Sequence, residues 1–326
     1  MNASSGNDEN ELEPTGGKWI CQITAGGAVI GVLGNILVCF VILRVKFLHN
    51  MTNYLLVNLA VADLLMCLLI FFFDLTSGGN CALYHIAPTS SGARQLFCRL
   101  LVSGYFIWVT SCASGYNLCV VTLERYYAIV HPLQYARKLT ATRMKILIAL
   151  IWIISFLFSI PLVFNTQPSD DPDHTCSEID YPHRVLSLLI GVFTFLVMYL
   201  LPITLTSLAY YKMQIALKRQ VKALNLQHAR AAAYDLVIAR QRLVSMLTIV
   251  LGALVILWTP SYVGLLLCLR PTKNGYFLYC GSKGFKYFKA IADLLFYLNS
   301  VINPIIYAFK YKKFRQGFKF AWCRHN

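Results

Sequence analysis

The segment CRLLVSGYFIWVTSCASGYNLCVVTLERYYAIVHP, from Cys98 to Pro132, decides the fold of this chain. No charged side chain occurs between Leu100 and Leu123. A helix of that length crosses the hydrocarbon layer of a bilayer, which is roughly 30 Å thick, at a rise of 1.5 Å per residue. Glu124 and Arg125 follow directly, and adjacent opposite charges at the mouth of a span are usually functional. The segment therefore predicts a membrane-spanning helix that ends in a functional ion pair.

The rest of the chain has the composition of an integral membrane protein. Of its 326 residues, 57% are hydrophobic and the mean hydropathy is +0.58, whereas soluble domains are about 45–50% apolar. Seven apolar segments are long enough to span, at residues 20–43, 53–76, 98–129, 144–164, 184–211, 241–269 and 286–309. We therefore expect an all-α membrane protein, a seven-transmembrane helix bundle over residues 20–309. Residues 1–18 have no hydrophobic stretch, so the first span is expected to direct insertion.

The net charge of +15 is distributed unevenly. Most Lys and Arg residues fall in alternate loops and in the C-terminal tail, whereas Asp235 is the one acid in those loops. Because positive loops stay in the cytoplasm, residues 1–19 should form an extracellular tail and residues 310–326 a cytoplasmic one. The charge thus favours a multi-pass protein of the plasma membrane, with the lipid bilayer and not a nucleic acid as its partner.

The C-terminal tail predicts a short eighth helix. Phe314, Phe318 and Trp322 recur at helical spacing among Lys and Arg residues, which is the pattern of an amphipathic helix on the inner leaflet. Cys323 at its end is a candidate for palmitoylation. At the other end of the chain, Asn2 begins an acceptor triplet for N-glycosylation.

A polar, aromatic or proline motif occurs in each span. In order, these are Asn35; Asp63 within NLAVAD; Cys98 with Glu124-Arg125-Tyr126; Trp152; Pro202 with Tyr210; Trp258-Thr259-Pro260; and Asn303-Pro304-Ile305-Ile306-Tyr307. In this set and order the chain resembles the rhodopsin-like (class A) G-protein-coupled receptors along almost its whole length. The resemblance implies a receptor that binds an extracellular ligand and activates a heterotrimeric G protein, and not an enzyme.

The resemblance also implies roles for individual side chains. An allosteric Na⁺ is expected, with no other cofactor, at Asp63, Ser114, Asn299, Ser300 and Asn303. The activation switch is expected at Glu124, Arg125, Tyr126, Tyr210, Trp258, Pro260, Asn303, Pro304 and Tyr307. Arg125, Pro132 and Leu133 are expected to contact the G protein.

The chain departs from the family's pattern in several places. Some relatives carry an acid at the foot of the sixth helix that pairs with the arginine; here Arg240-Gln241-Arg242 stands there, so we expect weak restraint on Arg125. Gly115 and Leu254 replace larger side chains usual beside Pro202.

The outer cysteines also differ. Cys98 lies about two residues further from Arg125 than is usual, so the outer end of this helix should be irregular. A Cys98–Cys176 disulfide is expected from the resemblance. A second bridge, Cys21–Cys280, is one possible pairing, with Cys81 left over.

The ligand is the least determined part. The third span has no acid between Ile107 and Ser111, which argues against a biogenic amine. Two carboxylates near aromatic side chains suit a cationic group, so a basic or amidated neuropeptide is favoured. The expected ligand-binding residues are Asp74, Tyr105, Trp108, Ser111, Trp258, Tyr262, Asp293 and Tyr297.

Several alternatives stay open. The ligand could be a small amine or a lipid, and Asp74 and Asp293 could pair with nearby lysines instead. A channel or transporter could use Asp63 and Asn303 to line an ion path. No H-E-x-x-H motif or nucleophile elbow favours an enzyme.

Overall fold

The computed structural model describes residues 18–76, 88–138, 140–170, 175–178, 184–226, 231–268, 280 and 282–323. Asn2 and Cys81 lie outside the described residues, as do the side chains of Asp74 and Cys323. The elements are α2 (Lys18–Arg44), η1 (Lys46–Leu48), α3 (Met51–Thr76), α4 (Ser91–Leu96), η3 (Phe97–Val102), α5 (Tyr105–Val130), α6 (Pro132–Lys138), α7 (Ala141–Ser159), η4 (Ile160–Phe164), β1 (Thr166–Pro168), β2 (Cys176–Glu178), α8 (Arg184–Thr194), η5 (Phe195–Leu200), α9 (Leu201–Leu226), α10 (Ala231–Leu267), α11 (Lys283–Lys310) and α12 (Lys312–Cys323).

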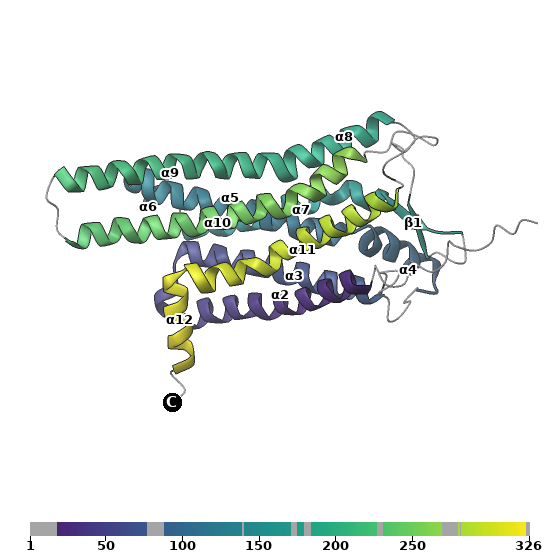
Figure 1. Ribbon diagram of the computed structural model, residues 1–326, viewed down its shortest axis with the longest axis horizontal. Coiled ribbons are helices and arrows are strands. Elements are labelled where there is room, and N and C mark those ends of the chain that lie inside the picture. Colours follow the sequence, from purple (N-terminus) through teal and green to yellow (C-terminus); the bar gives the residue numbers. More distant parts are fainter. Residues whose placement is uncertain are drawn as a thin grey trace, which may run out of the picture.

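The described part of the chain forms a bundle of seven helices long and apolar enough to cross a membrane. They run alongside one another, and α12 lies across the end of α2 and α11 (Figure 1). The predicted seven-helix bundle with an eighth helix is thus confirmed. The antiparallel pair β1–β2 was not predicted, since each strand has only three residues.

Small residues let α2 pack closely against its neighbours. A Cβ on Gly31 would overlap the Cys67 thiol of α3, and one on Gly34 would lie 3.1 Å from Pro304 Cβ in α11. Asn35 then donates its amide to the backbone oxygen of Ser300 at 2.9 Å. In lipid, such close backbone approach and interhelical hydrogen bonds replace the hydrophobic effect as the source of stability.

The entrance to α5 is irregular. The π-helical turn η3 follows α4, and the helix is interrupted at Gly104. The φ of Gly104 is 73°, the left-handed conformation that glycine adopts without strain. Cys98, within η3, forms the predicted disulfide with Cys176, with the two Cα atoms 5.7 Å apart. The Thr166 hydroxyl donates to the Cys98 carbonyl at 2.6 Å, which ties β1 to the same turn. The extra residues before α5 are therefore accommodated at its outer end.

α9 and α10 are longer than the sequence predicted. The expected spans ended at residue 211 and began at residue 241, but the helices extend to Leu226 and from Ala231. Hydropathy detects only the part of a helix that lies in lipid, whereas Lys, Gln, Arg, Ala and Leu continue a helix well in water. The Tyr234 hydroxyl donates to Asn225 Oδ1 at 3.1 Å and joins the two ends. Together they project beyond α2 and α3 (Figure 1).

The second disulfide differs from the expected Cys21–Cys280 pairing, which is wrong. Cys280 bonds to Cys268 instead, with Cα atoms 5.9 Å apart. The sequence placed Cys268 inside the sixth span, but α10 ends at Leu267, so the thiol of Cys268 lies just beyond the helix. Cys21 is disulfide-bonded too, to another partner.

Gly31→Ala should destabilise the protein by about 1–3 kcal/mol, because the added methyl group overpacks the α2–α3 contact. The measurement is the apparent melting temperature of the purified protein in detergent. Gly26→Ala is the matched control, since a Cβ there meets nothing within 4 Å. Cys67→Ala in the same chain should restore most of the loss, whereas equal melting temperatures for the Gly31→Ala and Gly26→Ala variants would contradict this packing.

Candidate functional site

A buried carboxylate lies at the centre of the bundle. Asp63 of α3 is 0% exposed. Its Oδ1 accepts hydrogen bonds from Ser114 at 3.0 Å and from Ser300 at 2.9 Å, and its Oδ2 accepts one from Asn303 at 2.7 Å. A buried carboxylate without such donors would cost several kcal/mol, so these contacts between α3, α5 and α11 are what allow Asp63 to be there.

The surroundings of Asp63 fit a hard cation. Asn303 Oδ1 is buried without a hydrogen-bond partner, and Asn299 is 3% exposed one turn earlier on the same face of α11. Carboxylate, hydroxyl and amide oxygens are the ligands that hard cations take. The structure thus brings all five residues of the predicted sodium site into the buried core between the helices.

A packed aromatic cluster is centred on Trp258 and Tyr262 of α10. Trp258 is 2% exposed and Tyr262 is 1% exposed. Phe296 contacts both, with ring centroids 5.1 Å and 6.4 Å away, and Tyr199 stacks on Tyr262 at 4.6 Å. Trp108 completes the cluster at 5.9 Å from Tyr262. Phe296 and Tyr199 were not predicted, although both sit on expected spans at helical spacing from predicted residues.

The cluster explains one departure from the family's pattern. A Cβ on Gly115 would lie 3.3 Å from Trp258 Cη2, so the glycine leaves room for the indole ring against α5. The indole N–H is buried without a hydrogen-bond partner.

The other predicted ligand-binding residues are spread around this cluster. Tyr105 donates to the Phe156 carbonyl at 3.2 Å and so faces η4 and α7. Ser111 donates to the backbone oxygen of Ile107 at 2.9 Å and lies beside Met66 of α3. Tyr297 lines a small cavity together with residues of α2 and α3. Through Phe296, whose ring lies 6.1 Å from that of Tyr297 and 5.6 Å from that of Trp108, Tyr297 also borders the aromatic cluster.

Asp293 has a different setting. It lies on α11 between Ala292, which is 1% exposed, and the aromatic cluster residue Phe296. Ser261 of α10 donates to the carbonyl of Ala292 at 2.8 Å, so the two helices are joined here. Within the described part of the chain, Asp293 forms no ion pair, but Lys289, one turn earlier on α11, is close enough to attract its carboxylate, so the expected alternative of a lysine partner stays open.

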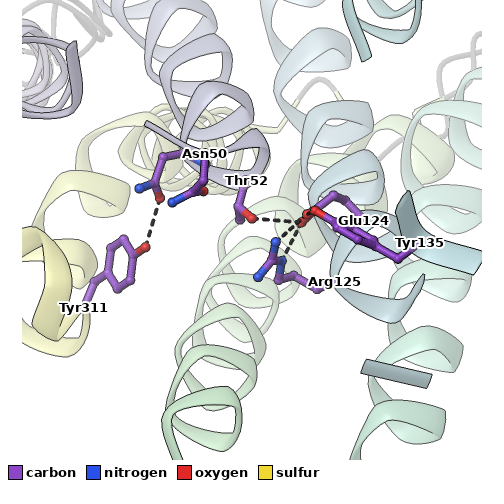
Figure 2. A network of polar contacts seen from close by, with 7 residues as sticks. Asn50, Thr52, Glu124, Arg125, Tyr135 and Tyr311 are labelled. Atoms are coloured by element: carbon purple, nitrogen blue, oxygen red, sulfur yellow. Dashed lines mark hydrogen bonds and ion pairs between the residues drawn. The ribbon is translucent and has the colours of Figure 1, made fainter. Parts of the chain in front are cut away.

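A second buried carboxylate lies near the C-terminal end of α5. Glu124 is 0% exposed and pairs with Arg125, whose side chain is 20% exposed. Figure 2 shows the carboxylate also facing Thr52 of α3 and Tyr135 of α6. The Thr52 hydroxyl donates to Oε2 at 2.9 Å and the Tyr135 hydroxyl donates to Oε1 at 2.5 Å.

Thr52 and Tyr135 were missed by the sequence analysis. Burial and the hydrogen bond to Glu124 raise the pKa of Tyr135 to about 12, so its phenol remains a proton donor. The restraint on Arg125, expected to be weak, therefore comes from a network of three elements. The sequence held one signal for Tyr135, a hydroxyl-bearing aromatic in the loop just after the Glu-Arg pair.

The same end of α3 also holds the start of α12. Tyr311, between α11 and α12, donates its hydroxyl to Asn53 Oδ1 at 2.9 Å (Figure 2). Asn53 donates to the carbonyl of Leu48 at 2.7 Å. Thr52 and Asn53 are consecutive residues of α3. Thr52 connects this helix to α5 through Glu124, and Asn53 connects it to the junction of α11 and α12 through Tyr311.

The remaining predicted switch residues lie on α5, α9, α10 and α11. Tyr210 of α9 accepts a hydrogen bond from the Thr122 hydroxyl at 2.9 Å. The Tyr307 hydroxyl is buried without a partner. Pro260 and Pro304 lie inside α10 and α11, where each removes one backbone hydrogen bond and permits a kink. Tyr126 lies 5.5 Å from the His131 ring and faces away from Glu124.

At this end of the bundle a cavity of about 300 Å³ is lined by Arg125, Pro132, Tyr135 and Arg240, among others. Next to it, Leu133 at the start of α6 is 97% exposed. The cavity wall also includes the apolar side chains of Ala128, Ile129 and Leu243, which makes the surface around Leu133 partly apolar. The predicted partner residues Arg125, Pro132 and Leu133 thus lie together.

Comparison with known proteins gives a consistent result. The family model described as "7 transmembrane receptor (rhodopsin family)" matches residues 34–307. Neuromedin-U receptor 2 of Rattus norvegicus is 32% identical over 317 residues, covering 91% of this chain and 75% of the relative. Histamine H2 receptor of Homo sapiens is 31% identical, covering 90% of this chain and 77% of the relative. Adenosine receptor A2a of Homo sapiens is 30% identical, covering 90% and 69%.

Proposed function

The chain belongs to the rhodopsin family of seven-transmembrane receptors, and from that premise we propose that it binds an extracellular ligand and activates a heterotrimeric G protein. The observation that carries the proposal is the Glu124 network. It holds Arg125 at the mouth of a cavity on the side of the bundle where the basic residues gather. A partner that engages Arg125 and Leu133 would have to open this network, which makes it a two-state element that ligand and partner both bias.

The proposed orientation follows the charge distribution. The N-terminus lies outside the cell and the C-terminus, with α12, lies on the inner leaflet of the plasma membrane. Residues 1–19 form the extracellular tail, 20–309 the transmembrane domain and 310–326 the cytoplasmic tail. In this orientation Asn2 is available for glycosylation and Cys323 for palmitoylation.

For the ligand we propose a basic or amidated peptide. Asp293 supports this because its carboxylate has no ion pair within the described residues and lies one turn before the aromatic Phe296 on α11. Such a setting attracts a cationic group. Relatives named as receptors for neuromedin-U, histamine and adenosine have similar identities, so similarity alone favours no ligand class. Asp293 equally suits the charged group of a small amine, which is the second candidate.

Sodium is proposed as an allosteric ligand at Asp63. The cation would compensate the charge that burial leaves on this carboxylate, with Ser114, Asn299, Ser300 and Asn303 supplying further oxygens. Rearranging α11 would disturb two of the hydrogen bonds to Asp63, so sodium binding would favour the resting arrangement of the switch.

The first test measures nucleotide exchange on a heterotrimeric G protein by the purified receptor in lipid vesicles. Tyr135→Phe should raise ligand-free exchange up to about tenfold, because a hydrogen bond worth about 0.5–1.5 kcal/mol is lost from the resting network. Tyr211→Phe, at a tyrosine that is 66% exposed on α9, is the control and should change nothing. Arg125→Ala should abolish exchange with expression intact. Exchange by wild type no faster than by the G protein alone would contradict the proposed coupling.

The ligand proposal is tested by screening basic peptides for activation of the receptor. Asp293→Asn should lower the potency of an active peptide tenfold or more, since a charged hydrogen bond is worth about 1.5–3 kcal/mol. Asp235→Asn, which removes the same charge from the exposed cytoplasmic end of α10, should leave potency unchanged. Equal potency on the wild type and on Asp293→Asn would discard this carboxylate as an anchor.

The sodium proposal is tested without any ligand. Replacing choline chloride with sodium chloride at equal ionic strength should raise the apparent melting temperature of the wild type, and Asp63→Asn should remove that rise. Asp293→Asn should keep it, which controls for the loss of any buried carboxylate. If Asp63→Asn and wild type respond alike, the cation binds elsewhere.

A further inference from the structure

The cytoplasmic cavity of about 300 Å³ contains two guanidinium groups. One belongs to Arg125 of α5 and the other to Arg240 of α10, and both side chains are partly buried. The remaining wall includes the apolar side chains of Ile129, Pro132 and Leu243. Two like charges beside apolar walls repel each other, because the walls lower the local dielectric and exclude screening ions.

The carboxylate nearest to this cavity has no capacity left for Arg240. Glu124 Oε1 accepts from Arg125 Nη2 and from the Tyr135 hydroxyl, and Oε2 accepts from Arg125 Nε and from Thr52. Two carboxylate oxygens offer about four acceptor sites in total, so Glu124 is saturated. Asp235, the nearest acid in sequence to Arg240, is exposed five positions earlier on α10 and does not line the cavity.

Both arginines therefore keep unused donors. Arg125 directs Nε and Nη2 to Glu124 and also lies within hydrogen-bond reach of Tyr135, which still leaves part of its five N–H donors unused. Arg240 forms no ion pair with any residue that the structure describes. A guanidinium carries five N–H donors in a planar fork, so the cavity presents a surplus of donors and of positive charge from opposite walls.

We propose that this cavity binds a phosphate group, which accepts hydrogen bonds from Arg125 and Arg240 together and so ties the cytoplasmic end of α10 to α5. A phosphate suits the site because its several charged oxygens can face two guanidinium forks at once, and such pairs are bidentate and strong. The volume corresponds to about ten water molecules at ~30 Å³ each, which is enough for a phosphate group with part of its hydration shell.

Two sources supply this chemistry, a soluble phosphate and the headgroup of a phosphoinositide in the inner leaflet. The excess of Lys and Arg at this end of the bundle attracts either. The bound anion would neutralise the positive charge of Arg240, which neither Glu124 nor an acidic residue of α10 neutralises. The inference stands apart from the proposed function, since it concerns binding to the receptor alone.

The experiment uses the full-length receptor and two probes, in the absence of any G protein. In detergent, inorganic phosphate is titrated against sodium chloride at constant ionic strength, and the apparent melting temperature is read. In nanodiscs of phosphatidylcholine with or without phosphatidylinositol bisphosphate, bound lipid is counted by native mass spectrometry after release. Arg240→Gln should weaken binding of the effective probe about tenfold or more. Arg219→Gln, which removes an exposed charge from α9, should leave it unchanged.

A charge-reversal variant, Arg240→Glu, controls for the case in which Arg240→Gln loses binding only because it unfolds. Arg240→Glu supplies its own carboxylate opposite Arg125, so this variant should melt at least as high as the phosphate-bound wild type and should not respond to either probe. A response to phosphate alone, to the lipid alone or to both supports the site and identifies its source. The proposal is overturned if neither probe binds, or if Arg240→Gln and Arg219→Gln bind the effective probe as tightly as the wild type.

Discussion

The hydrogen bonds to Glu124 are the contacts on which the packing around the C-terminal end of α5 depends. A carboxylate that is 0% exposed has lost its water and needs hydrogen-bond donors from the protein in its place. Here the donors come from α3, α5 and α6, so the three elements are held in one arrangement by the requirement of a single side chain. The same requirement fixes Arg125, because it is one of the donors.

Asp63 imposes the same condition nearer the centre of the bundle. Its donors come from α5 and α11, which adds α11 to the set of helices held by buried carboxylates. α5 is also joined to α9, by the hydrogen bond between the Thr122 and Tyr210 hydroxyl groups. Polar contacts of this kind are stronger in a low dielectric, but breaking one leaves a buried polar group unpaired, which costs free energy. The bundle is therefore stable in one arrangement and able to exchange it for another only as a whole.

Much of this could be predicted from the sequence, and the reasons are physical. Asp63, Asn303 and Arg125 stood out because charged or amide side chains are rare in apolar spans, and their order along the chain indicated the family. Other features gave no such signal. Thr52 and Tyr135 are ordinary in composition and became important only through a contact that joins distant elements. Cys268 was misassigned because hydropathy does not mark where a helix ends. Phe296 and Tyr199 were missed because an aromatic residue in an apolar span does not reveal which way its side chain points.

The length of α10 gives the protein a mechanical property. Ala231 lies about 44 Å from Pro260 by the rise of 1.5 Å per residue, so the helix acts as a lever with its fulcrum at the proline. A rotation of about 10° around that point would displace the far end by about 8 Å, from the geometry of a rigid rod of this length. Tyr234 and Asn225 couple that end to α9. A small angular change in the membrane must therefore either carry the tip of α9 along or cost that hydrogen bond, which makes the hairpin an amplifier of displacement.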